Sequence, residues 1–169
     1  LVDGTGSAAL DALAEVLSTR WTVETDNNVV RIIYADEDVA SYEIAPAFAA
    51  STGYKIPNGA SWMATDPKVH ATLVTEKNSA CGGQFVPFVK MIKRINRQAG
   101  DVIAPSFLLE VMALELVEPP FLTYPEEVRY FLASAAEGIT RNWPDPAHLG
   151  DDVNAGLTVS QRSALSSVI

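Results

Sequence analysis

The apolar residues of this chain recur at helical spacing from Asp66–Pro67 onward. Asp66 can cap a helix and Pro67 suits its first turn, so we expect a helix that runs from there to about Ala80. Three further helical segments follow, at about 84–98, 105–116 and 125–141. A last helix is expected where Thr158 and Gln161 have the spacing of a capping box. This long stretch therefore predicts a bundle of helices.

The first 65 residues combine one helical pattern with a strand pattern. The apolar spacing after Ser7, a candidate cap, predicts a helix over residues 8–19. Residues 28–34 are rich in β-branched and aromatic side chains, and residues 39–45 form a second strand-like run that ends before a proline. The turn-like segment 36–38 joins them, so we expect an antiparallel hairpin. Residues 47–65 have no clean period and are expected to form a long loop.

These patterns predict an α+β fold, a small antiparallel sheet followed by a helical bundle. We place the first domain at residues 1–65 and the helical domain at residues 66–169. The chain lacks the β–α alternation of a dinucleotide-binding fold, and it contains no glycine-rich phosphate loop, nucleophile elbow or zinc-protease helix motif. Any chemistry must therefore come from residues outside these common motifs.

The net charge of the chain argues against some classes of binding partner. The chain has 12 Lys and Arg against 21 Asp and Glu, a formal net charge of −9. Because such a chain lacks a broad positive field, long nucleic acid is not expected as a partner. We find no signal peptide and no apolar run that could cross a membrane. One cysteine and two histidines exclude an internal disulfide and a Cys/His zinc cluster, so we expect the protein in a reducing cytoplasm.

Glu43 is the first candidate for chemistry, because it lies in the middle of the second expected strand. A carboxylate there could ligate Mg²⁺, a hard ion that takes oxygen donors from one or two carboxylates and from substrate phosphates. The alternative is that Ser41, Glu43 and Ala45 form the solvent-exposed face of an edge strand.

Lys93 and Ser106 are the second candidate, on two successive expected helices. Lys93 directly follows Ile92 of the apolar stripe, so it lies beside the buried face. Ser106 is in the first turn of its helix, where free N–H groups and the helix dipole attract anions. Together they would suit a triphosphate. The alternative is that Lys93 is one of several solvated cations and that Ser106 only helps to start its helix.

Three aromatic residues, Tyr54, Trp62 and Phe107, could stack on a nucleotide base, although each could equally belong to the core. We identify no partners for Cys81 or His70 at the spacing of a nucleophilic triad. His70 is expected to face helix packing or solvent.

Five segments resemble one family of proteins, in the family's order. They are YEIAPAF (42–48), YKIP (54–57), WMATDPKVH (62–70), FVPFVKMIKRIN (85–96) and PSFLLEVMALEL (105–116). Over residues 8 to about 154, the chain resembles the second half of nucleotidyltransferases related to oligoadenylate synthetase and cyclic GMP–AMP synthase. The family includes the bacterial CD-NTase type, which makes cyclic oligonucleotide signals and serves antiviral defence.

The resemblance implies an active site between a nucleotidyltransferase sheet and a helical lobe, with Mg²⁺ or Mn²⁺ bridging three carboxylates and the donor triphosphate. Glu43 matches the third carboxylate, a metal ligand that helps to activate the attacking hydroxyl. Lys93 and Ser106 match the residues that hold the triphosphate, and Phe107 matches a position that often stacks on the donor base. Residues 1–65 would then be a partial nucleotidyltransferase core.

Two departures from the family's pattern have consequences. The family's Gly-Ser motif and the Asp-x-Asp pair that follows it are missing, because Gly6–Ser7 leads directly into a helix pattern. Glu43 stands where the family usually has Asp, which lengthens the ligand by one methylene. Two of the three metal carboxylates are therefore missing, and both ends of the chain look cut. We expect either a fragment of a nucleotidyltransferase or a chain whose front half was lost. Alone it is expected to be inactive, and the N-terminal half of the same protein is an expected partner.

The expected function is transfer of a nucleoside monophosphate from ATP or another nucleoside triphosphate to a ribose hydroxyl, with Mg²⁺. The acidic composition favours a small acceptor and a cyclic or short oligonucleotide product. Two alternatives stay open. One is a tRNA-end or polynucleotide-end nucleotidyltransferase, which a positively charged groove would favour. The other is a noncatalytic interaction domain that kept the fold.

Overall fold

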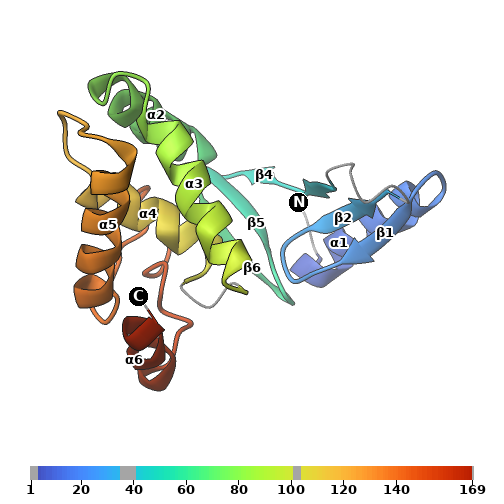
Figure 1. Ribbon diagram of the computed structural model, residues 1–169. Helices are drawn as coiled ribbons and strands as arrows, with labels where there is room; N and C mark the ends of the chain where they lie inside the picture. The colour runs from blue at the N-terminus through green and yellow to red at the C-terminus, as the bar shows by residue number, and fades with distance from the viewer. Residues whose placement is uncertain (1–3, 35–40, 101–103, 169) are drawn as a thin grey trace. The chain divides into compact units, whose positions relative to one another are not determined.

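A computed structural model describes residues 4–34, 41–100 and 104–168 (Figure 1). It divides into two compact units, Leu1–Asp66 and Pro67–Ile169, and each unit is described by itself. The predicted turn at residues 36–38 and the first two residues of the predicted strand at 39–45 lie outside the described residues.

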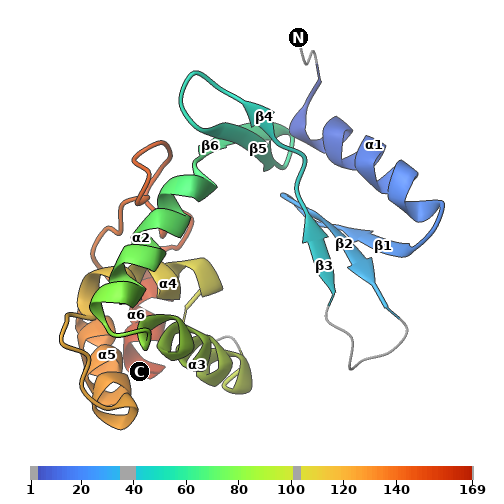
Figure 2. The same ribbon diagram turned by 90° about the horizontal axis from the view of Figure 1, so that it is seen from above.

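The described residues of the first unit form one helix and two three-stranded antiparallel sheets, of order β1-β2-β3 and β4-β5-β6 (Figure 2). Its elements are α1 (Gly6–Ser18), β1 (Thr22–Thr25), β2 (Val30–Ile33), β3 (Tyr42–Ile44), β4 (Phe48–Ala49), β5 (Tyr54–Asn58) and β6 (Ser61–Thr65). The predicted pairing is present, because β2 and β3 are antiparallel neighbours. The strand β1, which pairs with the other edge of β2, was not predicted.

The prediction of a long loop at residues 47–65 is wrong, because β4, β5 and β6 lie there. Pro57 lies within β5, opposite Trp62 of β6, and proline usually argues against a strand. It fits here because β4 pairs only with Tyr54 and Lys55, so β5 has no partner from β4 at Pro57. Gly59, with φ of +58°, makes the tight turn between β5 and β6.

The N-cap of helix α1 lies two residues before the cap that the sequence predicted. Thr5, and not Ser7, is the N-cap, and its hydroxyl accepts a hydrogen bond from the backbone N–H of Ala8 at 3.2 Å. Leu10 of α1, Val30 and Ile32 of β2 and Pro57 of β5 are buried in this unit. The predicted helix is therefore correct, and its N-terminus is fixed by a different side chain.

The described residues of the second unit form five helices, at the five places where the sequence predicted helices. They are α2 (Pro67–Ala80), α3 (Phe85–Gln98), α4 (Ser106–Leu116), α5 (Tyr124–Gly138) and α6 (Val159–Val168). The buried core includes side chains of α3, α4 and α5 and of the loop that follows α5, and its largest fully buried members are Trp143, Phe85, Phe88, Phe131, Ile92, Leu108, Leu109 and Met112. The α+β fold class predicted from the sequence is thus confirmed.

Helices α3 and α4 contact each other within this core, and α4 also contacts α2 and α5. The apolar stripe of α3 is buried at Phe88 and Ile92, so the residues that flank the stripe are held at the edge of the core. Among the described helices, none has the length and apolarity that a membrane crossing requires.

Candidate functional site

The side chain of Lys93 is held at the junction of α3 and α4. It follows the fully buried Ile92, and this position leaves the lysine side chain 31% exposed at the edge of the core. Its Nζ donates a hydrogen bond to Oε2 of Glu110 on α4 at 2.5 Å, and the Glu110 side chain is 25% exposed. Lys93 is therefore a partly buried cation with a fixed partner, and not one of several solvated cations.

Ser106 and Glu110 share one face of α4, because residues four apart on a helix are neighbours. Ser106 is the first residue of α4, follows the N-cap Pro105, and is exposed. The first N–H groups of a helix have no partner within the helix. The face of α4 that contacts Lys93 through Glu110 therefore also carries the Ser106 hydroxyl, one turn closer to the helix N-terminus and its free N–H groups.

Phe107 lies beside this helix start and is 41% exposed. Its ring contacts the imidazole of His70 on α2, with 5.2 Å between the ring centroids and 37° between the planes. The contact fixes the Phe107 ring while leaving much of it accessible. An accessible aromatic ring with a fixed orientation is suited to stacking on a base.

His70 takes part in helix packing, as expected, because its ring contacts Phe107 of α4. The sequence did not predict its second partner, since Nε2 of His70 also lies 3.0 Å from Oδ1 of Asp145. The two residues are 75 positions apart, so no local spacing could have indicated the pair. The sequence also did not single out Glu110, although its spacing of four from Ser106 was a usable signal.

The Asp145 carboxylate is nearly buried and well satisfied. Burial acts to raise its pKa, but the backbone N–H groups of Leu149 and Ala147 and the imidazole of His70 all bond to it. These interactions outweigh burial, so the pKa of Asp145 lies below its ordinary value. The ionised carboxylate thereby anchors the imidazole on which Phe107 rests.

Glu43 lies in the first unit, in the middle of β3 as predicted. Its Oε1 accepts hydrogen bonds from Nη2 and Nε of Arg31, its cross-strand partner on β2, at 2.8 and 3.1 Å. The hydrogen bond with Glu43 raises the pKa of Arg31 above its ordinary value. The Glu43 side chain is 53% exposed, so it is an accessible carboxylate that already has a cationic partner.

The residues described by the structure do not form a metal site on their own. No group of three or more His, Cys, Asp or Glu residues among them could hold an ion. Glu43 offers one carboxylate, whereas the two-metal arrangement implied by the family resemblance needs three. Any metal site that includes Glu43 requires ligands from outside the described residues.

The other aromatic candidates take part in the packing of the first unit. Trp62 of β6 packs edge to face on Phe48, with 4.9 Å between centroids, and its Nε1 donates to the Gly4 carbonyl oxygen at 3.1 Å. Tyr54 is paired in β5 between Ala49 and Thr65. Of the three aromatic candidates, Phe107 is the one that lies beside Ser106.

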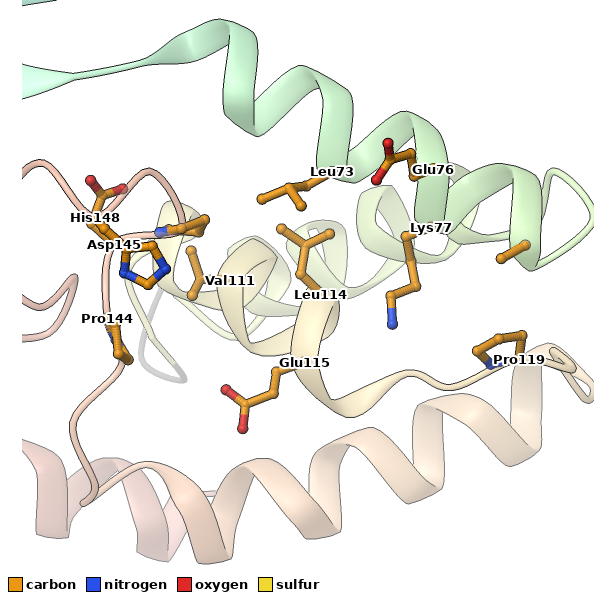
Figure 3. A pocket seen from close by; sticks show the side chains of 12 residues that line it. Leu73, Glu76, Lys77, Val111, Leu114, Glu115, Pro119, Pro144, Asp145 and His148 are labelled. Atoms are coloured by element: carbon orange, nitrogen blue, oxygen red, sulfur yellow. The ribbon is translucent and has the colours of Figure 1, made fainter. Parts of the chain in front are cut away.

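A separate cavity of about 530 Å³ lies in the helical unit, between α2, α4 and the loop that follows Trp143 (Figure 3). Leu73, Val111 and Leu114 form an apolar wall of the cavity. The side chains of Glu76, Glu115 and Asp145 also line the cavity. None of the four predicted site residues lines this cavity.

A strip of cations occupies the exposed side of α3. Lys90, Arg94 and Arg97 are all exposed and recur at helical spacing, so they lie along one side of the helix. This strip is a local positive surface on a chain with a net charge of −9.

The chain is similar in sequence to a probable cyclic nucleotide synthase of Bacillus cereus (strain VD146), with 28% identity over 122 residues that cover 67% of this chain. The chain spans only 37% of the length of that relative. Models of known protein families give no match.

The fold is similar to that of a solved structure, the CdnE cyclic dinucleotide synthase of Elizabethkingia meningoseptica with GTP and Apcpp. The TM-score is 0.62 at 14% identity, and the match covers 96% of this chain and 67% of that chain. The resemblance expected from the sequence is therefore confirmed: the chain is similar in sequence to a probable cyclic nucleotide synthase and in fold to a cyclic dinucleotide synthase.

Proposed function

We propose that this chain is the nucleotide-binding part of a nucleotidyltransferase that transfers a nucleoside monophosphate from ATP or another nucleoside triphosphate to a ribose hydroxyl. A cyclic or short oligonucleotide would be the product. The proposal is supported by the similarity to a probable cyclic nucleotide synthase and by a fold shared with a synthase whose structure contains GTP and Apcpp. Because the chain spans 37% of the sequence relative, the activity of the whole protein is part of this proposal.

One observation carries the assignment of the phosphate site. Lys93 of α3 reaches the face of α4 that begins with Ser106, so an ammonium, a hydroxyl and a helix N-terminus lie on adjoining helices. Phosphate groups are bound by this combination, because the cation and the N–H groups of the first helical turn both stabilise negative charge. We therefore propose that Lys93 and Ser106 hold the triphosphate and that the donor base stacks on Phe107.

Glu43 is the residue that we assign to Mg²⁺ or Mn²⁺, which would neutralise the triphosphate and orient the attacking hydroxyl. A single carboxylate bonded to Arg31 does not make a metal site alone, so we derive no step of the transfer from it. The role of the described residues is to bind and orient the nucleotide.

Thermal unfolding with and without ATP tests the proposal. A ligand at about 100 times its dissociation constant stabilises the folded protein by roughly 2.7 kcal/mol, which is several degrees for a unit of this size. We expect the shift to be largely lost in Lys93→Ala and reduced in Ser106→Ala. Arg94→Ala is the matched control, because it removes an exposed cation from the next position of α3. A shift of equal size in Lys93→Ala, or no shift in the wild type at saturating ATP, contradicts the proposal.

A polynucleotide acceptor is the second candidate, and the cation strip Lys90, Arg94 and Arg97 is the observation that favours it. The strip lies on the exposed side of one helix, and phosphate contacts from three cations give only weak binding. We therefore keep a small acceptor as the leading candidate. Retention of single-stranded RNA by the wild type, lost when the three cations are changed to Gln, would reverse this order.

A further inference from the structure

We infer that Glu110 competes with the triphosphate for the Lys93 ammonium, and that this competition sets the affinity of the phosphate site. The inference rests on the proposed function, because it assumes that Lys93 is the residue that binds phosphate. It adds an acidic residue to a site that the sequence described only by its cation and hydroxyl.

The position of the ion pair is the first step of the argument. Nζ of Lys93 lies 2.5 Å from Oε2 of Glu110, which is one turn further along α4 than Ser106. Four residues of α-helix correspond to about 6 Å along the helix axis. The lysine ammonium is therefore placed beside Glu110 and away from the hydroxyl and N–H groups of the helix start. To hold a phosphate together with Ser106, it must leave Glu110 or divide its three hydrogen bonds between carboxylate and phosphate.

The surroundings make the competition strong. Lys93 and Glu110 are both partly buried, and they border a small cavity of about 160 Å³ whose walls include Val74, Phe85 and Val89. Interactions between charges are screened less beside apolar walls than in open solvent. A phosphate that approaches Lys93 is therefore repelled by the Glu110 carboxylate at short range.

The opposite role for Glu110 would be to position Lys93 and so to strengthen phosphate binding. That benefit is limited to the conformational freedom that a lysine side chain loses on binding. Repulsion between a carboxylate and a multiply charged phosphate in a partly buried site is the larger effect. We therefore assign a net weakening of binding to Glu110.

Affinities for ATP and for inorganic tripolyphosphate test the inference, measured by calorimetric titration of the wild type, Glu110→Gln, Lys93→Met and the double variant. Glu110→Gln keeps the size of the side chain and removes its charge. We expect it to tighten binding of both ligands by about tenfold. In the Lys93→Met background the same change should give little gain, because there is no ammonium for which to compete. Glu115→Gln, which removes an exposed carboxylate of α4 that is paired with Arg141, is the matched control.

The outcomes separate the inference from the proposal on which it rests. Weaker binding in Glu110→Gln would show that Glu110 positions the lysine, and this overturns the inference. An equal gain with and without Lys93 would show general repulsion without competition, which also overturns it. If Lys93→Met binds both ligands as tightly as the wild type does, the proposed phosphate site itself is wrong. Urea unfolding of each variant checks that the helical unit is intact.

Discussion

At the scale of single residues, Gly6 shows how tightly α1 is held against the turn between β5 and β6. Its backbone N–H donates to the Ala60 carbonyl oxygen at 3.3 Å. A Cβ atom at this position would lie 2.2 Å from the Ser61 carbonyl oxygen and 2.8 Å from that of Gly59. Both neighbours are backbone atoms, so neither can move without disturbing the turn.

We predict that Gly6→Ala destabilises the protein by about 1–3 kcal/mol, because the clash outweighs the roughly 1 kcal/mol by which alanine favours a helix over glycine. The measurement is the free energy of unfolding in urea. Gly4→Ala is the control, since a Cβ there has no atom within 4 Å. Equal stability of the two variants would mean that the turn does not hold α1 in the way described.

Asp145 gives a second residue-scale prediction, on the pH dependence of stability. Because the pKa of its carboxyl is lowered in the folded protein, Asp145 stabilises the fold above the unfolded-state pKa of about 3.9. That contribution is lost as the pH falls through the lower, folded-state pKa. Asp145→Asn should therefore cost about 1–3 kcal/mol at neutral pH, and less in more acidic solution.

Urea unfolding at pH 7 and at about pH 3 measures this difference. Asp151→Asn, which removes an exposed carboxylate from the same loop, is the control. If the two variants lose the same stability at both pH values, the bonds from His70, Ala147 and Leu149 do not stabilise the carboxylate.

Local sequence patterns can mark single residues of the candidate site, but they cannot show which residues meet in the folded protein. Lys93 and Ser106 could be proposed from the sequence because each is marked by its place in a helix, beside an apolar stripe or in a first turn. His70 and Asp145 meet through tertiary packing across 75 positions, so no local pattern links them. Lys93 and Glu110 are likewise on different helices, and the apolar pattern of a single helix does not indicate which residue of another helix a side chain will contact.

At the scale of elements, the side chain of Arg162 links α6 to the loop before it. The Arg162 guanidinium donates to the carbonyl oxygens of Asn154, Leu157 and Thr140 and to Oδ1 of Asn142, at 2.7 to 3.3 Å. These acceptors belong to the segments that follow α5 and precede α6. The arginine therefore joins the last helix to the loop before it.

We predict that Arg162→Met loosens α6 while leaving the rest of the helical unit folded. The change keeps much of the apolar stem and removes the charge-assisted hydrogen bonds, which contribute about 1.5–3 kcal/mol each at most. Hydrogen exchange of the α6 amides should accelerate, whereas amides of α3 and α4 should not change. Arg129→Met, on the exposed side of α5, is the control. Unchanged exchange in α6 would contradict the assignment.

The helices and the paired strands β2 and β3 could be predicted from the sequence, whereas β1, β4, β5 and β6 could not. A helix of 11 to 15 residues, such as α2 to α5, repeats its apolar pattern several times and is bounded by caps, proline and glycine. Strand β4 has two residues and β5 contains Lys55, Pro57 and Asn58, so neither shows a regular alternation. Their strand structure depends on pairing with neighbours that local sequence does not reveal.

At the scale of the whole molecule, the net charge of −9 and the cation strip of α3 act in opposite directions. The net charge repels an approaching polynucleotide, whereas Lys90, Arg94 and Arg97 attract its phosphates at short range. Screening by salt weakens both effects, so the salt dependence of binding shows how many direct contacts are made.

We predict that any binding of single-stranded RNA depends on salt with a slope of about −2 in a plot of log affinity against log salt concentration, since three cations each contribute about −0.7. Fluorescence anisotropy of a labelled oligonucleotide over a salt series measures the slope. Changing the three cations to Gln should remove the binding. A much steeper slope, or binding that survives this change, would place the RNA on another surface.

The pairing of Lys93 with Glu110 has an evolutionary consequence. A carboxylate that competes for a lysine is harmful without that lysine, because it would only repel the phosphate. Positions 93 and 110 should therefore change together among the homologues of this chain, and sequences that lose the cation at the first should lose the acid at the second. Such covariation would trace the history of the phosphate site more sensitively than Ser106 alone, because a hydroxyl at a helix start is also favoured for reasons unrelated to nucleotides.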